Sequence, residues 1–215
     1  TEESDAFFDD IVASTGNVDF SNVSLTKMGV QIANNTGLSQ TISANANSQL
    51  FGGEIEFFDA SGGTNDIFDY VSALKAGDGT GIAASTALTL TQQNSQPGSA
   101  TLLSANSSGA VELNYSQAFL NFDIQAANAA TVVANIEAIL ESGTISSGGA
   151  LTQGGVNTDM LLVFYEASSQ GTTSDAVIVR YQEGAASEAD YAGELTIVAD
   201  FEGVAQGAFA DASFN

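Results

Sequence analysis

The run MLLVFYE at residues 160–166 is followed by AVIVRYQ at 176–182 and ELTIVAD at 194–200. Each run is rich in β-branched, aromatic and long apolar residues, which fit the buried surface of a sheet. The segments between the runs contain Ser, Gly, Ala and Thr, which is typical of connecting turns. The last quarter of the chain therefore predicts three consecutive β-strands.

Weaker strand signals continue through the rest of the chain. Met28, Val30 and Ile32 alternate with polar residues, and Glu54–Phe57 alternates in the same way. Further candidate strands lie at 38–42, 87–91, 100–103, 111–115 and 120–124. About ten short strands separated by turn residues predict a mainly β fold of the β-sandwich or jelly-roll type.

Three segments have helical periodicity, and we expect them to form short peripheral helices. The first begins after Ser4, the second begins after Asn65 and ends at Gly77, and the third covers 126–141. The apolar residues spaced for one helix face in the first two segments are Phe7, Phe8, Ile11, Val12, Ile67, Phe68, Val71 and Leu74.

The charge balance excludes two classes of partner. Lys and Arg together number 3 against 26 Asp and Glu, which gives a formal net charge of −23. Such a chain cannot neutralise a run of phosphates, so we expect no nucleic-acid binding and no binding to an anionic membrane surface. Every apolar run is far shorter than the roughly 20 residues that span a bilayer, so we also expect no membrane insertion.

The residue types that the sequence lacks exclude several kinds of bond, metal site and catalysis. The chain has no Cys, no His and no Trp. Disulfides, the usual zinc, copper, haem and iron–sulfur sites, and catalysis by Cys or His are therefore excluded. No Gly-x-Ser-x-Gly elbow occurs, and for Arg180 in its strand-like run we expect a salt bridge to an acidic neighbour. We predict that the protein is not an enzyme and has no catalytic residues.

The C-terminal region resembles bacterial calcium-dependent proteins of the haemolysin (RTX) type, which are exported by type I secretion. The resemblance rests on the aromatic pair Phe164–Tyr165, on Val-Arg-Tyr at 179–181, on GELTIV at 193–198 and on the acidic tail with its terminal aromatic residue. Two shorter matches lie upstream, NVDFSNVSL at 17–25 and GGTNDIFD at 62–69. The resemblance implies an extracellular or surface-layer protein that depends on calcium.

Two features limit what the resemblance implies. The calcium repeat of these proteins, Gly-Gly-x-Gly-x-Asp, occurs as one degenerate copy at 62–67, so no calcium-filled β-roll is expected. The sequence also begins at Thr1 rather than Met, and we expect a preceding segment to have been removed. The length suits one domain, 1–215, divisible into 1–125 and the secretion-like 126–215.

Calcium is the metal that this composition accommodates, because it binds carboxylate, amide and carbonyl oxygens. The candidate ligands are the polar residues of 59–69 and of the following acidic loop: Asp59, Asn65, Asp66, Asp69 and Asp78. An alternative stays open, in which Asn65 caps a helix and the acids of its first turn complement the helix dipole.

These observations favour a non-enzymatic, extracellular structural protein. Only 13% of the residues are charged, which leaves broad surfaces of Ser, Thr, Asn, Ala and Gly for neutral contacts. We therefore expect a subunit of a surface layer or an extracellular filament whose partners are copies of itself. The alternative is a C-terminal secretion and folding module of a larger type I-secreted adhesin or toxin.

Overall fold

The computed structural model describes residues 10–13, 18–19, 29–32, 41–43, 50–56, 66–69, 90–94, 109–115, 118–121, 129–142, 159–167, 173–182, 191–210 and 213–214. Its elements, in chain order, are β1 (Asp10–Ala13), β2 (Val18–Asp19), β3 (Gly29–Ile32), β4 (Thr41–Ser43), β5 (Leu50–Glu56), β6 (Ile67–Asp69), β7 (Leu90–Gln93), β8 (Ala110–Leu113), α2 (Ala129–Glu141), β9 (Asp159–Tyr165), β10 (Thr173–Gln182) and β11 (Leu195–Ala205).

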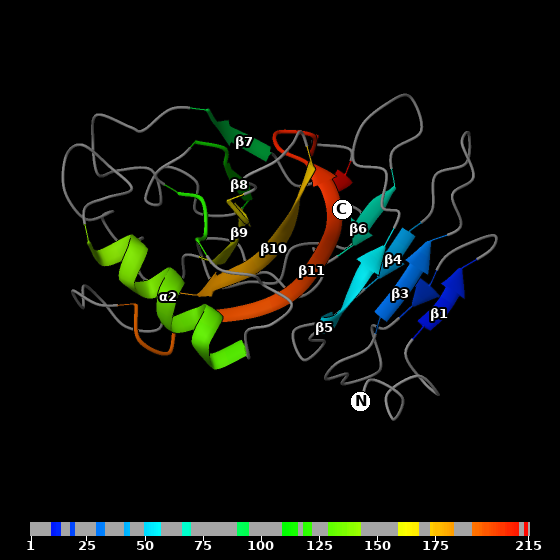
Figure 1. Cartoon of the computed structure of the whole chain (residues 1–215), viewed down its shortest axis with the longest axis horizontal. Coiled ribbons are helices and arrows are strands. Elements are labelled where there is room, and N and C mark those ends of the chain that lie inside the picture. Colours follow the sequence, from blue (N-terminus) through cyan, green and yellow to red (C-terminus); the bar gives the residue numbers. More distant parts are fainter. Residues whose placement is uncertain are drawn as a thin grey trace.

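The strands form two sheets (Figure 1). Eight strands share a large sheet in the order β1-β3-β5-β11-β10-β9-β8-β7, and three form a small sheet in the order β2-β4-β6. In the large sheet only β10 runs antiparallel to its neighbours, and every other described pairing is parallel. Both pairings of the small sheet are parallel as well.

The first half of the described chain winds as a parallel coil. Successive strands alternate between the sheets: β1, β3 and β5 join the large sheet, whereas β2, β4 and β6 join the small one. Parallel strands need long crossover connections, and here each crossover carries a strand of the other sheet. Each turn of the coil therefore stacks on the turn before it, as in repeat proteins.

The end of the chain adds a further turn to this coil. β11 pairs in parallel with β5, with Ala199 opposite Leu50 and Phe201 opposite Ile55. Phe214 then forms a parallel bridge to Phe68 of β6 in the small sheet. The C-terminal segment thus continues both sheets of a coil whose earlier turns lie more than a hundred residues upstream.

Strands β9, β10 and β11 lie side by side in the large sheet, and most of their described residues are buried, on both faces of the sheet. Every residue of β9 is buried, which explains its nearly continuous apolar sequence. Val177 lies opposite Phe164, and Val179 lies opposite Leu162, in the antiparallel β9–β10 pair. Gly193, with φ of +79°, lies in the turn that leads into β11.

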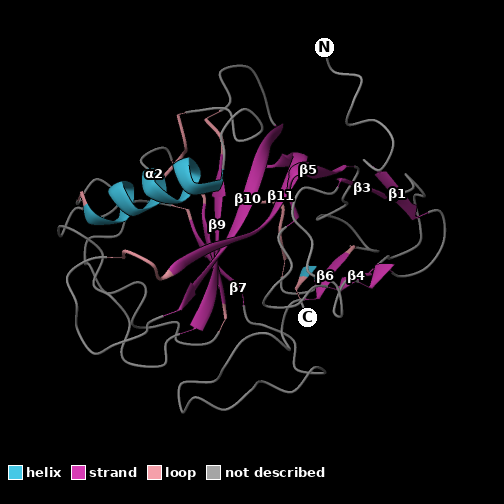
Figure 2. Cartoon of the chain, turned by 90° about the horizontal axis from the view of Figure 1, so that it is seen from below, coloured by secondary structure: helices cyan, strands magenta, loops and turns pink. Residues whose placement is uncertain are grey.

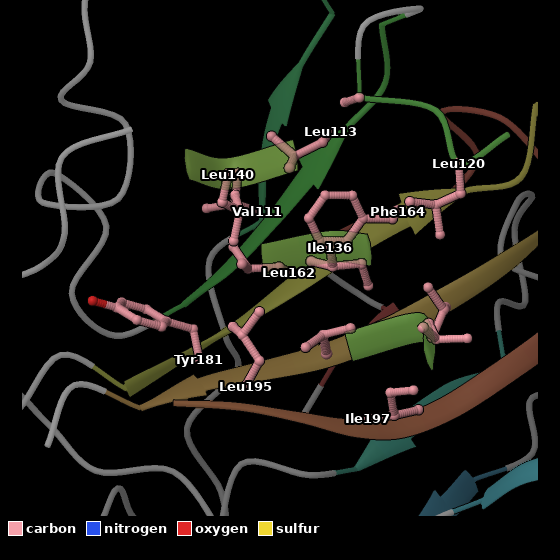
Figure 3. Packing of buried hydrophobic residues seen from close by; sticks show 14 of the residues in the cluster. Val111, Leu113, Leu120, Ile136, Leu140, Leu162, Phe164, Tyr181, Leu195 and Ile197 are labelled. Atoms are coloured by element: carbon pink, nitrogen blue, oxygen red, sulfur yellow. The ribbon is translucent and has the colours of Figure 1, made fainter. Parts of the chain in front are cut away.

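Two apolar clusters cover the two faces of this sheet. On one face α2 packs Val132, Ile136 and Leu140 against alternate residues of β8 to β11 (Figure 3). On the other face Ile42 and Phe68 of the small sheet join the intervening residues of the large sheet. Figure 2 shows α2 on one side of β9–β11 and the strands β4 and β6 on the other side.

The predicted mainly β character is confirmed, and the runs at 160–166, 176–182 and 194–200 correspond to β9, β10 and β11. The β-sandwich or jelly-roll arrangement is not confirmed. Jelly rolls and sandwiches are built from antiparallel strands, whereas most described pairings are parallel. Sequence periodicity reports which face of a strand is buried, and it does not report the direction of the neighbouring strand.

The predicted helix count differs from the structure. The helix expected at 126–141 is confirmed as α2, and it is the one α-helix among the described residues. The other two expectations are wrong where they can be compared, because Ile11 and Val12 lie in β1, and Ile67 and Phe68 lie in β6. These β-branched and aromatic residues follow their strand preference once parallel neighbours are present. Phe7, Phe8, Val71 and Leu74 lie outside the described residues.

Candidate functional site

The principal cluster of buried polar groups surrounds Glu112 of β8. Val111 and Leu113 of β8 face α2. Glu112 lies between them in the strand, so its side chain points to the opposite face of the sheet. Glu112 has no exposed surface. The Tyr165 hydroxyl donates a hydrogen bond to Oε1, and Gln92 Nε2 donates one to Oε2 at 2.8 Å. We call Gln92, Glu112 and Tyr165 the acceptor cluster, because the segment after β11 binds there; the name does not refer to hydrogen-bond acceptors.

The segment after β11 lies on this cluster. We call it the C-terminal arm; it is described at residues 206–210 and 213–214. Gln92 Nε2 donates to the carbonyl oxygens of Gly207 and Phe209 at 3.1 Å and 2.8 Å. The Gly207 N–H donates to the Tyr165 hydroxyl at 3.2 Å. Three strands, β7, β8 and β9, therefore hold the arm through one set of polar contacts.

The backbone of the arm turns at Gly207. Its φ is +74°, a region that favours glycine, and the turn is closed by a hydrogen bond from Ala208 N–H to Ala205 C=O at 3.0 Å. A Cβ at this position would lie 2.6 Å from Asn114 Nδ2. The same Asn114 amide donates to Asn94 Oδ1 at 3.0 Å. A side chain at position 207 would therefore disturb this amide pair.

Aromatic packing fixes the rest of the arm. The Phe209 ring lies 5.7 Å from Phe201 and 5.4 Å from Phe214, measured between ring centroids. It also lies 6.5 Å from Tyr165, so the polar and apolar contacts of the arm meet at the same residue. Phe209 and Phe214 are both fully buried. The arm thus belongs to the core on the face opposite α2.

The environment shifts both titratable groups of the cluster. Burial raises the pKa of Glu112, and hydrogen bonds from Tyr165, Gln92 and the backbone N–H groups of the arm offset part of the rise. Burial, followed by the neighbouring Glu112 charge, raises the pKa of Tyr165. Tyr165 therefore stays protonated and acts as a donor. The Glu112 carboxyl group has no exposed surface, and the hydrogen bonds described for it join separate segments of the same chain.

A second buried polar contact joins β9 to β10. Arg180 Nε lies 2.7 Å from Asp159 Oδ1, and Nη2 lies 2.6 Å from Oδ2, so the contact is bidentate. Arg180 is 8% exposed and Asp159 is 1% exposed. The salt bridge expected for Arg180 is confirmed.

The candidate calcium ligands fall only partly within the described residues. Asp66 is 3% exposed and immediately precedes β6, and Asp69 is the last residue of that strand. The alternative, in which these acids occupy a helix N-terminus, is wrong because 67–69 is a strand. Asp59, Asn65 and Asp78 lie outside the described residues. Within the part of the chain that the structure describes, no three acidic residues lie close enough together to hold a metal ion.

The acceptor cluster was not predicted from the sequence. The available signal was a single acid in the otherwise apolar run AVEL at 110–113. A charged residue in such a strand is either exposed on one face or buried with specific partners. Nothing local shows that the partners come from β7, β9 and the end of the chain.

Comparisons with known proteins add no family assignment. No family model, no curated protein and no solved structure matches this chain. The resemblance to haemolysin-type proteins therefore stays a prediction. Among the described residues no helix is both long and apolar enough to cross a membrane.

Proposed function

We propose that this chain is a non-enzymatic, extracellular structural protein that assembles with copies of itself into a surface layer or a filament. The observation that carries the proposal is the parallel coil. Its first turn places β1 at one end of the large sheet and β2 at the corresponding end of the small sheet. No described strand lies beyond either one, and the terminal turns of stacked structures readily associate unless they are capped.

The chemistry of the buried polar groups also supports a structural role. Glu112 and Asp159 are the kinds of residue that serve as acids or bases in enzymes. Here each is buried, and each is hydrogen-bonded to a side chain of another strand. These groups hold strands together rather than line an accessible cleft.

We also propose that calcium ions stabilise the assembly of these copies. A subunit with a net charge of −23 repels its copies, and a divalent cation lowers that repulsion. The proposed ligands remain Asp66 and Asp69, at the two ends of the β6 segment, and Asp59, Asn65 and Asp78, which precede or follow that segment in the sequence.

Self-association of the purified full chain tests the proposal. Sedimentation velocity and electron microscopy, at neutral and acidic pH and with and without millimolar calcium, should show filaments or two-dimensional arrays in at least one condition. Dispersed monomers in every condition would contradict the proposal.

One feature favours a second candidate, a C-terminal secretion and folding module of a larger type I-secreted adhesin or toxin. The end of the chain supplies β11, which lies between β5 and β10, and Phe214, which extends the small sheet. The two sheets are therefore completed only when the segment that contains β11 and Phe214 is present. A passenger protein fused to the N-terminus of this chain should then be exported through a type I system. Loss of export when the passenger is fused to the C-terminus instead would support the second candidate.

A further inference from the structure

We infer that the C-terminal arm of one copy binds the acceptor cluster of a neighbouring copy, and that this exchange joins subunits. The inference rests on the proposed function, because it names the element through which copies assemble. The binding surface is defined by what occupies it: Gln92, Tyr165 and the Phe201 ring already bind an arm of this sequence. The partner is therefore a second copy of the same chain.

The joint between β11 and the arm allows this exchange. The last residue of β11, Ala205, pairs with Thr173 of β10, and the arm begins directly after it. Gly203 and Gly207, with φ of +66° and +74°, lie on either side of the joint. The arm can therefore leave without breaking a β10–β11 or β5–β11 pair.

The contacts of the arm with other strands are regained in a neighbour, whereas the hydrogen bond from Ala208 to Ala205 belongs to the joint itself. The polar contacts are the hydrogen bonds with Gln92, with Tyr165 and with Glu112. The apolar contacts are the burial of Phe209 and Phe214 and the bridge to Phe68. An exchanged arm makes the same contacts between chains that it makes within one chain. The balance between the two states then depends mainly on protein concentration and on the joint.

The charge of the interface also suits exchange. Two copies that each carry −23 associate more readily through surfaces of low charge, and the sequence of the arm from 206 to 214 contains one acid, Asp211. The described residues of the arm carry no ionisable side chain. They contact the Gln92 amide, the Tyr165 hydroxyl and aromatic rings, and their backbone N–H groups contact Glu112. Glu112, the acid of the cluster, is screened by its own hydrogen bonds.

Exchange of this kind can join more than two copies. Each copy has one arm and one acceptor cluster, and these are different surfaces. When copy after copy gives its arm to the next, the interface is head-to-tail, and such interfaces generate rings or filaments. A reciprocal exchange between two copies gives a closed dimer instead.

Thiol crosslinking tests the inference cleanly because the chain has no cysteine of its own. One variant is Asn114→Cys, next to the acceptor cluster, and the other is Ala208→Cys, in the arm. Asn114 Nδ2 lies 2.6 Å from the position that a Cβ on Gly207 would occupy, so the two sites are neighbours when an arm is bound. A mixture of the two single variants, unfolded, refolded together under assembly conditions and treated with a short bifunctional thiol reagent, can crosslink only between chains.

We expect a crosslinked dimer from this mixture and none from either variant alone. Ala134→Cys, exposed on α2, mixed with Ala208→Cys is the matched control and should give no dimer. The double variant Asn114→Cys/Ala208→Cys should crosslink within one chain when monomeric, and between chains, as a ladder, when assembled.

Each contrary result has a separate meaning. Assemblies that form without the 114–208 crosslink would overturn arm exchange and leave self-assembly standing. A monomeric double variant that does not crosslink would contradict the position of the arm and overturn the inference as well. A wild-type chain that never assembles would remove the proposed function and the inference together.

Discussion

The Tyr165 hydroxyl donates a hydrogen bond to the Glu112 carboxylate within the core, although the two residues lie 53 positions apart in the chain. The same hydroxyl accepts the Gly207 N–H from the C-terminal arm. One phenol group therefore connects β8, β9 and the end of the chain. Its removal should weaken all three connections at once.

Tyr165→Phe should lower the free energy of unfolding by about 1–3 kcal/mol, because the buried Glu112 carboxylate loses a donor. Urea denaturation measures the loss. The matched background is Glu112→Gln, in which a neutral amide has less need of that donor, so the same substitution should cost less there. Equal losses in both backgrounds would contradict a role for this hydrogen bond.

The stability of the protein should also depend on pH through Glu112. Burial raises its pKa in the folded chain above the ordinary value of 4.5, so the folded chain binds this proton more tightly than the unfolded chain does. The contribution is fully present below the unfolded pKa and is lost as the pH rises through the folded pKa.

The free energy of unfolding of the wild type, minus that of Glu112→Gln, should therefore fall as the pH rises from 4.5 toward neutrality. Tyr165, the other titratable group of the cluster, stays protonated in this range. Denaturant titrations of both proteins at several pH values measure the difference. A difference that rises with pH would show that the hydrogen bonds to the carboxylate outweigh its burial.

Gly207→Ala should destabilise the protein more than Gly203→Ala. Both residues have positive φ, so each substitution costs about 1 kcal/mol or more in backbone energy. At Gly203 a Cβ meets nothing within 4 Å, whereas at Gly207 it displaces the Asn114 amide from Asn94. Thermal melting compares the two variants, and Asn114→Ala should remove the difference between them. Equal melting temperatures of Gly207→Ala and Gly203→Ala in a chain that keeps Asn114 would contradict the crowding at Gly207.

Because the Arg180–Asp159 ion pair is buried, replacing one of its residues should destabilise the protein more than replacing both. Arg180→Met leaves Asp159 buried without its bidentate partner, which costs about 3–5 kcal/mol. Combining Arg180→Met with Asp159→Leu replaces both charges by apolar groups and should recover most of that loss. Equilibrium unfolding of the two variants measures the recovery. A double variant less stable than the single one would mean that the pair contributes more than it costs to bury.

The sequence predicted those parts of the fold that depend on local pattern. The apolar run of β9 and the helical spacing of α2 each specify one element, and both elements are present. Ile67 and Phe68 show the limit, because two adjacent apolar residues fit a helix face and a short strand equally well. Their strand conformation depends on β4, 26 residues upstream (Thr41 opposite Ile67), and on Phe214 at the end of the chain.

The acceptor cluster could not be predicted from the sequence for a related reason. Glu112 is bound by residues that lie 20 and 53 positions away, and the arm contacts Gln92 across 117 positions. Such contacts are set by strand order, and strand order is fixed by the assembled sheet rather than by any one segment. The ion pair of Arg180 was predictable because an isolated cation in a buried strand requires an acidic partner.

Calcium should raise the melting temperature of the full chain more than sodium does at matched ionic strength. Screening by a monovalent salt weakens repulsion among the acids, whereas a bound ion adds stability by mass action on the folded state alone. The substitution Asp66→Asn together with Asp69→Asn should remove the additional stabilisation if these acids bind the ion. Glu202→Gln, an exposed acid on β11, is the matched control and should leave it unchanged. Calorimetric scans with a chelator, with sodium and with calcium measure all three proteins. Equal melting temperatures in the two salts would leave only general screening and would remove calcium from the proposal.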